Sequence, residues 1–149
     1  VKLDLSDAAA RQELFARIGA AGRNVLTVTE GLLVYLTPEQ VGSLASDLRR
    51  HPSFRWWIID LVSPALLRML QRRYGPKLSA GGAPLRFGPE EGIEFFRRFG
   101  WRAAEVRSSF EEGRRLRRQP PLAWLFRLAA CLTPPGKRIV GSLALLERA

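Results

Sequence analysis

The chain has 149 residues, of which 46% are hydrophobic, so it is long and apolar enough to form one domain around its own core. It contains no run of about 18 apolar residues, so no membrane-spanning helix is expected. A single cysteine and a single histidine exclude an internal disulfide framework and the usual ligand set of a zinc site. The lone cysteine also favours a reducing, cytoplasmic location.

Lysine and arginine outnumber aspartate and glutamate by 24 to 14, and the formal net charge is +10. Nearly all of this positive charge is arginine, spread along the chain and densest at residues 114–118. Such a cluster is either a solvated linker or a surface for phosphate, an acidic substrate or an acidic partner. One hypothesis is therefore a non-catalytic basic α/β module that binds an acidic partner or nucleic acid.

The first elements alternate between strand and helix. Residues 1–5 have the pattern of the end of a strand. Residues 7–21 carry apolar side chains at helical spacing, with Gly22 as the expected C-cap. Residues 24–28 are then predicted to form the next strand.

The predicted 24–28 strand is followed by an acid and a glycine. Val25, Leu26 and Val28 are apolar and β-prone, as in a strand that is covered on both faces. Glu30 then places a carboxylate at the carboxyl end of the strand, the edge where open α/β sheets bind ligands. Gly31 allows a sharp turn or a close approach to a ligand. This layout is typical of a nucleotide or cofactor site, although an acid at the end of a strand is more often a solvated loop residue.

A helix is predicted over residues 38–50. Thr37 is its expected N-cap, Pro38 its first residue and Gln40 the partner in a capping box. An apolar stripe follows the spacing i, i+3, i+4, i+7, and it consists of Val41, Leu44, Ala45 and Leu48. His51 follows this helix and is interpreted as a surface loop residue.

The second half of the chain continues the alternation. Residues 55–62 form a predicted strand interrupted by Asp60, which is either at the edge of a site or a structural acceptor. A helix from residue 64 is expected to stop at residues 75–76, Gly-Pro, before a loop over 78–85.

A further helix is predicted over 89–99, with Gly100 as its C-cap, and a strand over 103–109. The remaining elements are a helix, a turn and a final strand, at residues 121–132, 134–136 and 138–146. Cys131 lies in the predicted helix and is interpreted as a small core residue. Helix alternating with strand predicts a mostly parallel sheet.

Residues 30–36, with the sequence EGLLVYL, closely resemble the EGLLxYL segment of the leucine carboxyl methyltransferase family. This family comprises S-adenosylmethionine-dependent O-methyltransferases. Asp4-Leu5 lies one helix upstream, where the family has an Asp-Leu pair, and residues 87–91 and 95–101 resemble a late helix that ends in Gly-Trp. The motifs occur in the family's order, and the resemblance covers nearly the whole chain.

The resemblance implies an α/β fold, the C-terminal half of a Rossmann-like class I methyltransferase, whose last strand is antiparallel. It implies S-adenosylmethionine as the cofactor, with Asp4 and Leu5 flanking the adenine and Glu30 and Gly31 near the methionine and ribose. Tyr35 is expected either to line the cofactor or acceptor cavity or to pack under the following helix.

The methyl acceptor is then a carboxylate or hydroxyl of a small molecule or protein, and neither nucleic acid nor a membrane is expected as a partner. Methyl transfer depends mainly on alignment and water exclusion, so no catalytic side chain or metal is implied.

The chain departs from the family in one large respect. It has neither a Gly-rich loop after a first strand nor the acid that holds the ribose, because residues 19–22 and 81–82 do not fit that loop. We therefore expect residues 1–149 to form a single unit, the C-terminal half of a methyltransferase domain that is inactive alone. Its 24–28 strand, the fourth in the family's sheet, would then expose an edge open to self-association.

Overall fold

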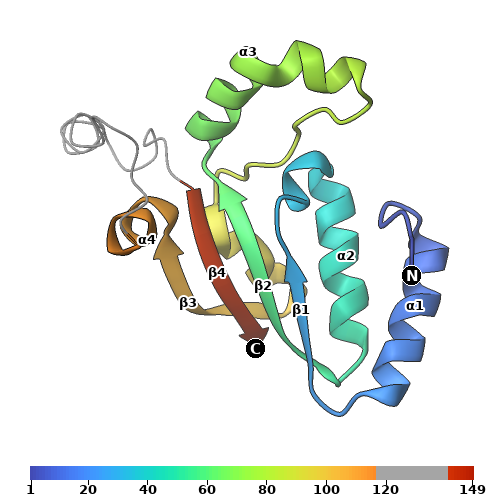
Figure 1. Cartoon of the computed structure of the whole chain (residues 1–149). Coiled ribbons are helices and arrows are strands. Elements are labelled where there is room, and N and C mark those ends of the chain that lie inside the picture. Colours follow the sequence, from blue (N-terminus) through green and yellow to red (C-terminus); the bar gives the residue numbers. More distant parts are fainter. Residues whose placement is uncertain (117–140) are drawn as a thin grey trace.

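Four strands form one mixed sheet in the order β1-β2-β4-β3 (Figure 1). The computed structural model describes residues 1–116 and 141–149. Strand β1 is parallel to β2, whereas β4 is antiparallel to both of its neighbours. The strands are β1 Val25–Thr29, β2 Phe54–Val62, β3 Trp101–Ser108 and β4 Gly141–Arg148. The predicted α/β class with an antiparallel last strand is thus confirmed.

The helical elements connect these strands. They are α1 Ala8–Ala21, the 3-10 helix η1 Leu33–Tyr35, α2 Pro38–Arg50, α3 Pro64–Ala80, the 3-10 helix η2 Gly92–Phe99 and α4 Ser109–Arg115. The capping box predicted for α2 is confirmed, since Gln40 N donates to Thr37 Oγ1 and Thr37 N donates to Gln40 Oε1. Asp7 caps α1 by accepting a hydrogen bond from the N–H of Ala10.

The core lies on one face of the sheet, here called the inner face. Trp57 of β2 is fully buried there, 5.4 Å from the Phe96 ring and 5.7 Å from the Trp101 ring. The indole N–H of Trp57 donates to Thr29 Oγ1, and that of Trp101 donates to the Ala45 carbonyl, each over 3.0 Å. The predicted stripe of α2 packs on this face, because its four side chains are all buried in the same cluster, Val41, Leu44, Ala45 and Leu48.

The opposite face of the sheet, the outer face, is largely bare. Leu26 and Val28 of β1 are 50% and 57% exposed, and Trp56 of β2 is 37% exposed. The expectation that β1 is covered on both faces is therefore wrong for the described residues. The physical reason is that α1, α2 and η2 contribute their buried side chains to the cluster on the inner face.

Two local predictions are also wrong. Residues 1–5 form no strand, because Asp4 Oδ1 accepts hydrogen bonds from the backbone N–H and hydroxyl of Ser6 and folds the segment into a turn. Helix α3 does not stop at Gly75 but continues through Pro76 to Ala80. Most of this last part of α3 is exposed, so water can bind the carbonyl that proline leaves without a donor.

The remaining predictions are confirmed with shifted ends. The helix predicted over 89–99 is the 3-10 helix η2, the strand predicted over 103–109 is β3, and the described part of the last strand is β4. The predicted 121–132 helix with Cys131, the 134–136 turn and residues 138–140 lie outside the described residues, as do residues 117–118 of the arginine cluster.

Candidate functional site

The carboxyl ends of β1 and β2 meet at one edge of the sheet. The backbone N–H of Gly31 donates to Asp60 Oδ1 over 3.0 Å, which joins the two strand ends. Gly31 has a φ of 60°, and no atom lies within 4 Å of the position that a Cβ would take. Asp60 is therefore a structural acceptor at the edge of the candidate site, and the backbone at Gly31 is open to a ligand.

Glu30 lies at this edge with a free carboxylate. Its side chain is exposed and forms no hydrogen bond or ion pair with any residue that the structure describes. A carboxylate in this state can accept hydrogen bonds from an amine or from hydroxyl groups.

Tyr35 is held near the same strand ends by its neighbours in η1 and by Leu36, the residue after η1. Leu33 and Leu36 are buried on either side of it, and the Val34 carbonyl accepts hydrogen bonds from the N–H groups of Arg86 and Phe87 over 2.7 and 3.1 Å. Tyr35 itself is partly exposed. Its phenol group forms no hydrogen bond within the described part of the chain, so a cavity role and a packing role both stay predictions.

Asp4 and Leu5 occupy a separate turn. Figure 1 shows α2 between β1 and this N-terminal segment. The Leu5 carbonyl accepts a 2.7 Å hydrogen bond from Arg11 Nη1, and the backbone and hydroxyl of Ser6 hold the pKa of Asp4 below its usual value. No hydrogen bond connects these two residues to Glu30 or Gly31 among the described residues, and their place beside the adenine stays a prediction.

A buried ion pair that the sequence analysis missed holds this turn in place. Arg11 is 1% exposed, and its Nε donates to Asp47 Oδ2 over 2.8 Å. Arg11 Nη2 also donates to Asp47 and, over 2.7 Å, to Ser43 Oγ. Arg11 thereby connects α1, α2 and the Leu5 carbonyl. The sequence did contain a signal for the burial of Arg11. Arg11 and Phe15 are four positions apart in α1, so they lie on the same buried face of this helix.

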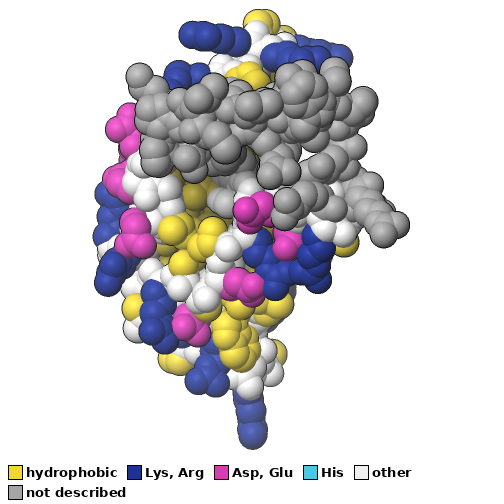
Figure 2. All heavy atoms as spheres, turned by 90° about the vertical axis from the view of Figure 1, so that its left-hand side faces the viewer, with side chains coloured by type: hydrophobic (Ala, Val, Ile, Leu, Met, Phe, Trp, Pro, Cys, Tyr) yellow, Lys and Arg dark blue, Asp and Glu magenta, His cyan; other side chains and the backbone are white. Residues whose placement is uncertain are grey.

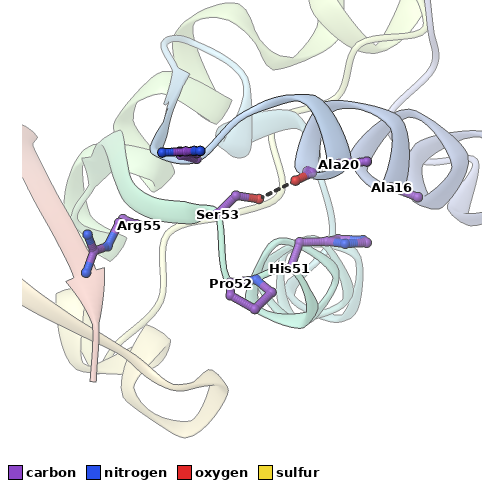
Figure 3. A pocket seen from close by; sticks show the side chains of 8 residues that line it. Ala16, Ala20, His51, Pro52, Ser53 and Arg55 are labelled. Atoms are coloured by element: carbon purple, nitrogen blue, oxygen red, sulfur yellow. Dashed lines mark hydrogen bonds between the residues drawn. The ribbon is translucent and has the colours of Figure 1, made fainter.

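A cavity of about 520 Å³ lies at the other end of the strands (Figure 3). Its wall includes the end of α1, and the Ser53 hydroxyl there donates to the Gly19 carbonyl over 3.0 Å. The lining contains three basic or titratable side chains and no carboxylate; in full it is Ala16, Gly19, Ala20, Arg23, His51, Pro52, Ser53 and Arg55. This cavity is distinct from the edge that carries Glu30, because β1 and β2 begin beside the cavity and run away from it to end at Thr29 and Val62, near the Gly31–Asp60 hydrogen bond.

The described residues contain no group of three or more His, Cys, Asp or Glu side chains that could hold a metal ion. They also contain no helix with the length and hydropathy needed to cross a bilayer.

The fold is similar to that of a solved structure, a DUF574 family protein from Streptomyces avermitilis, with a TM-score of 0.59 and 16% sequence identity. The alignment covers 100% of this chain and 54% of that one, so the chain spans about half the length of the solved protein. That protein has a methyltransferase-like fold, and the similarity shows the same fold here. No protein-family model matches the sequence, and no curated protein matches it.

Proposed function

We propose that the chain is part of an S-adenosylmethionine-dependent O-methyltransferase, with a carboxylate or hydroxyl of a small molecule or protein as the acceptor. The observation that carries this proposal is the edge at the strand ends, where Glu30 has no partner among the described residues and Gly31 is open beside Asp60. Ligands of open α/β sheets bind at this edge. The methyltransferase-like fold and the EGLLVYL segment support the same function.

The chemistry of these groups fits the cofactor. Glu30 would accept hydrogen bonds from its amine or hydroxyl groups, and Gly31 would allow its backbone to approach. Asp4 and Leu5 would flank the adenine, and Tyr35 would line the cavity. The cofactor supplies an activated methyl group when it is bound. The protein's part is to align the acceptor oxygen and exclude water, so an ionised carboxylate acceptor needs no general base.

The test is calorimetric titration of S-adenosylmethionine into the whole protein. Glu30→Ala should weaken binding by about 1–3 kcal/mol, the usual cost of leaving polar groups unpaired. Glu13→Ala is the matched control, because Glu13 is an exposed acid on α1 without a hydrogen-bond partner in the described part of the chain. Unchanged affinity in a folded Glu30→Ala variant would remove this residue from the site. A wild-type protein that does not bind S-adenosylmethionine would refute the function.

A second candidate function is a basic module that binds nucleic acid or another acidic partner. The specific observation is the cavity lined by Arg23, His51 and Arg55 without an acid (Figure 3). The carboxyl ends of α1 and α2 border it, so the arginines also offset the partial negative charge of these helix ends. This electrostatic role at the helix ends accounts for the arginines, and no bound partner is needed to explain them. The methyltransferase proposal is therefore favoured.

Fluorescence anisotropy with a labelled single-stranded oligonucleotide tests the second candidate. Arg23→Glu with Arg55→Glu should abolish binding, and Arg72→Glu on the exposed part of α3 should weaken it only slightly. Equal effects of the two changes would show that the cavity is not the binding surface.

A further inference from the structure

The ion pairs on the β3 side of the molecule are exposed. Figure 2 shows basic and acidic side chains interspersed on this side. Arg102 forms a 2.9 Å ion pair with Glu147, and Arg107 pairs with Glu105 over 2.6 Å. Exposed pairs of this kind contribute little to stability, because water screens both charges.

The pair of Arg11 and Asp47 is of a different kind, because its side chains are only 1% and 3% exposed. Taking two charges out of water is expensive, and apolar side chains of similar size in place of a buried pair are often as stable or more stable. A gain in stability therefore does not account for this pair. A geometric role does, because two buried charges are satisfied in few arrangements of the helices that carry them.

The donors of Arg11 are divided between two segments of the chain. Its Nε and Nη2 donate to Asp47, and Nη2 also donates to Ser43 Oγ, so this side of the guanidinium is fixed on α2. Gln12 holds the other oxygen of Asp47 over 3.0 Å. The Nη1 atom donates in the other direction, to the Leu5 carbonyl before α1, over 2.7 Å. Because the guanidinium is planar and rigid, it sets the position of this carbonyl relative to α2.

The turn that contains Leu5 is closed by its own hydrogen bonds. The Asp7 N–H donates to the Asp4 carbonyl over 3.1 Å, and Ser6 donates twice to Asp4 Oδ1. Asp4 Oδ2 has no partner within the described ranges, so it can accept a hydrogen bond from an amino group. Figure 1 shows α1 leading from this turn back to the start of β1, so the turn lies toward the end of the sheet where β1 ends.

We propose that Arg11 is a positioning residue of the cofactor site, which holds the Leu5 carbonyl and thereby sets where the Asp4 carboxylate meets the amino group of the adenine. The inference rests on the proposed function, because it requires S-adenosylmethionine as the cofactor. Arg11 itself does not touch the cofactor. Loss of Arg11 should therefore change the selectivity for the base, in addition to any change in stability.

The test is calorimetric titration of the whole protein with two ligands that differ only in the base. S-adenosylhomocysteine has a 6-amino donor, and S-inosylhomocysteine has a 6-oxo acceptor in its place. The wild type should bind the first at least about 10-fold more tightly, because a hydrogen bond to a charged group is lost with the second. The Arg11→Met, Asp47→Leu variant removes both buried charges together, and the two ligands should bind to it almost equally. Arg11→Lys should also lower the ratio, because one ammonium group cannot span the Leu5 carbonyl and Asp47 as the guanidinium does.

The control is Arg17→Met, which removes an exposed arginine of α1 that has no hydrogen-bond partner in the described part of the chain. It should keep the wild-type ratio, and thermal unfolding identifies the variants that are folded. A purely structural role of Arg11 would weaken both ligands equally, so a wild-type ratio in the folded Arg11 variants would overturn the inference alone. A wild-type protein that binds neither ligand would refute the proposed function and the inference with it.

Discussion

Gly31 and Asp60 are 29 residues apart in the sequence, and a 3.0 Å hydrogen bond from the Gly31 N–H to Asp60 Oδ1 joins them. The bond connects the carboxyl ends of two parallel strands. It therefore holds the loop that begins with Glu30 against β2. The acid that interrupts the apolar pattern of β2 thus has a structural role at the edge where a ligand would bind.

Replacing Asp60 should loosen this edge. Asp60→Leu removes the acceptor and should lower the free energy of unfolding by about 1 kcal/mol, the typical net value of one hydrogen bond. Asp60→Asn retains a carbonyl oxygen and should keep most of the stability. Urea titration of both variants measures the difference, and equal stability would show that the contact contributes nothing.

Two threonines on the same face of β1 should respond in opposite ways to valine. Thr29 Oγ1 accepts the buried indole N–H of Trp57, so Thr29→Val should cost about 1–3 kcal/mol of stability. Thr27 Oγ1 is buried without a hydrogen-bond partner among the described residues, so Thr27→Val should be neutral or stabilising. Thermal unfolding compares the two variants, and similar losses in both would contradict the assigned hydrogen bond.

The buried pair of Arg11 and Asp47 should be sensitive to the loss of one partner. Asp47→Ala leaves the Arg11 guanidinium buried without its counter-charge and should destabilise the fold by about 3–5 kcal/mol. The double variant Arg11→Met, Asp47→Leu removes both charges and should recover a large part of this loss. Denaturant unfolding of the single and double variants measures the coupling, and additive losses would be the contrary result.

The N-terminal turn should depend on pH through Asp4. Ser6 lowers the pKa of Asp4 below 3.8 by its backbone and hydroxyl hydrogen bonds. The turn is thus stabilised above the unfolded pKa of this carboxyl, and the contribution is lost as the pH falls through the lower folded value. Ser6→Ala removes the hydroxyl donor and should raise the pKa part of the way back. An NMR titration of the Asp4 carboxyl in the wild-type and Ser6→Ala chains measures the change, and an identical pKa in both would contradict the role of the Ser6 hydroxyl.

The role of Tyr35 can be separated from its packing. If Tyr35 lines the cofactor or acceptor cavity, Tyr35→Ala should lower turnover in the whole protein more than it lowers stability, and Tyr35→Phe should show whether the phenol hydroxyl matters. Methyltransfer assays and unfolding curves on the same preparations provide the comparison. Unchanged turnover in both variants would leave Tyr35 as a packing residue.

Local signals in the sequence determined a large part of this fold. The Thr37–Gln40 capping box and the Val41–Leu48 stripe depend on residues three or four positions apart, and both are present as predicted. The β1 strand and the position of Glu30 and Gly31 after it were also readable, because apolar β-prone residues and a following glycine act over a few positions.

Tertiary contacts decided the rest. Arg11 and Asp47 are 36 residues apart. The sequence does not identify them as partners, because they meet only when α1 packs on α2. Residues 1–5 have a strand-like composition, but a strand needs a neighbour for its backbone groups, and the Asp4–Ser6 hydrogen bonds form instead. The exposure of Leu26 and Val28 was not predictable in the same way. The sequence shows that both side chains are apolar, but only the packing of the helices decides which face of the sheet the helices cover.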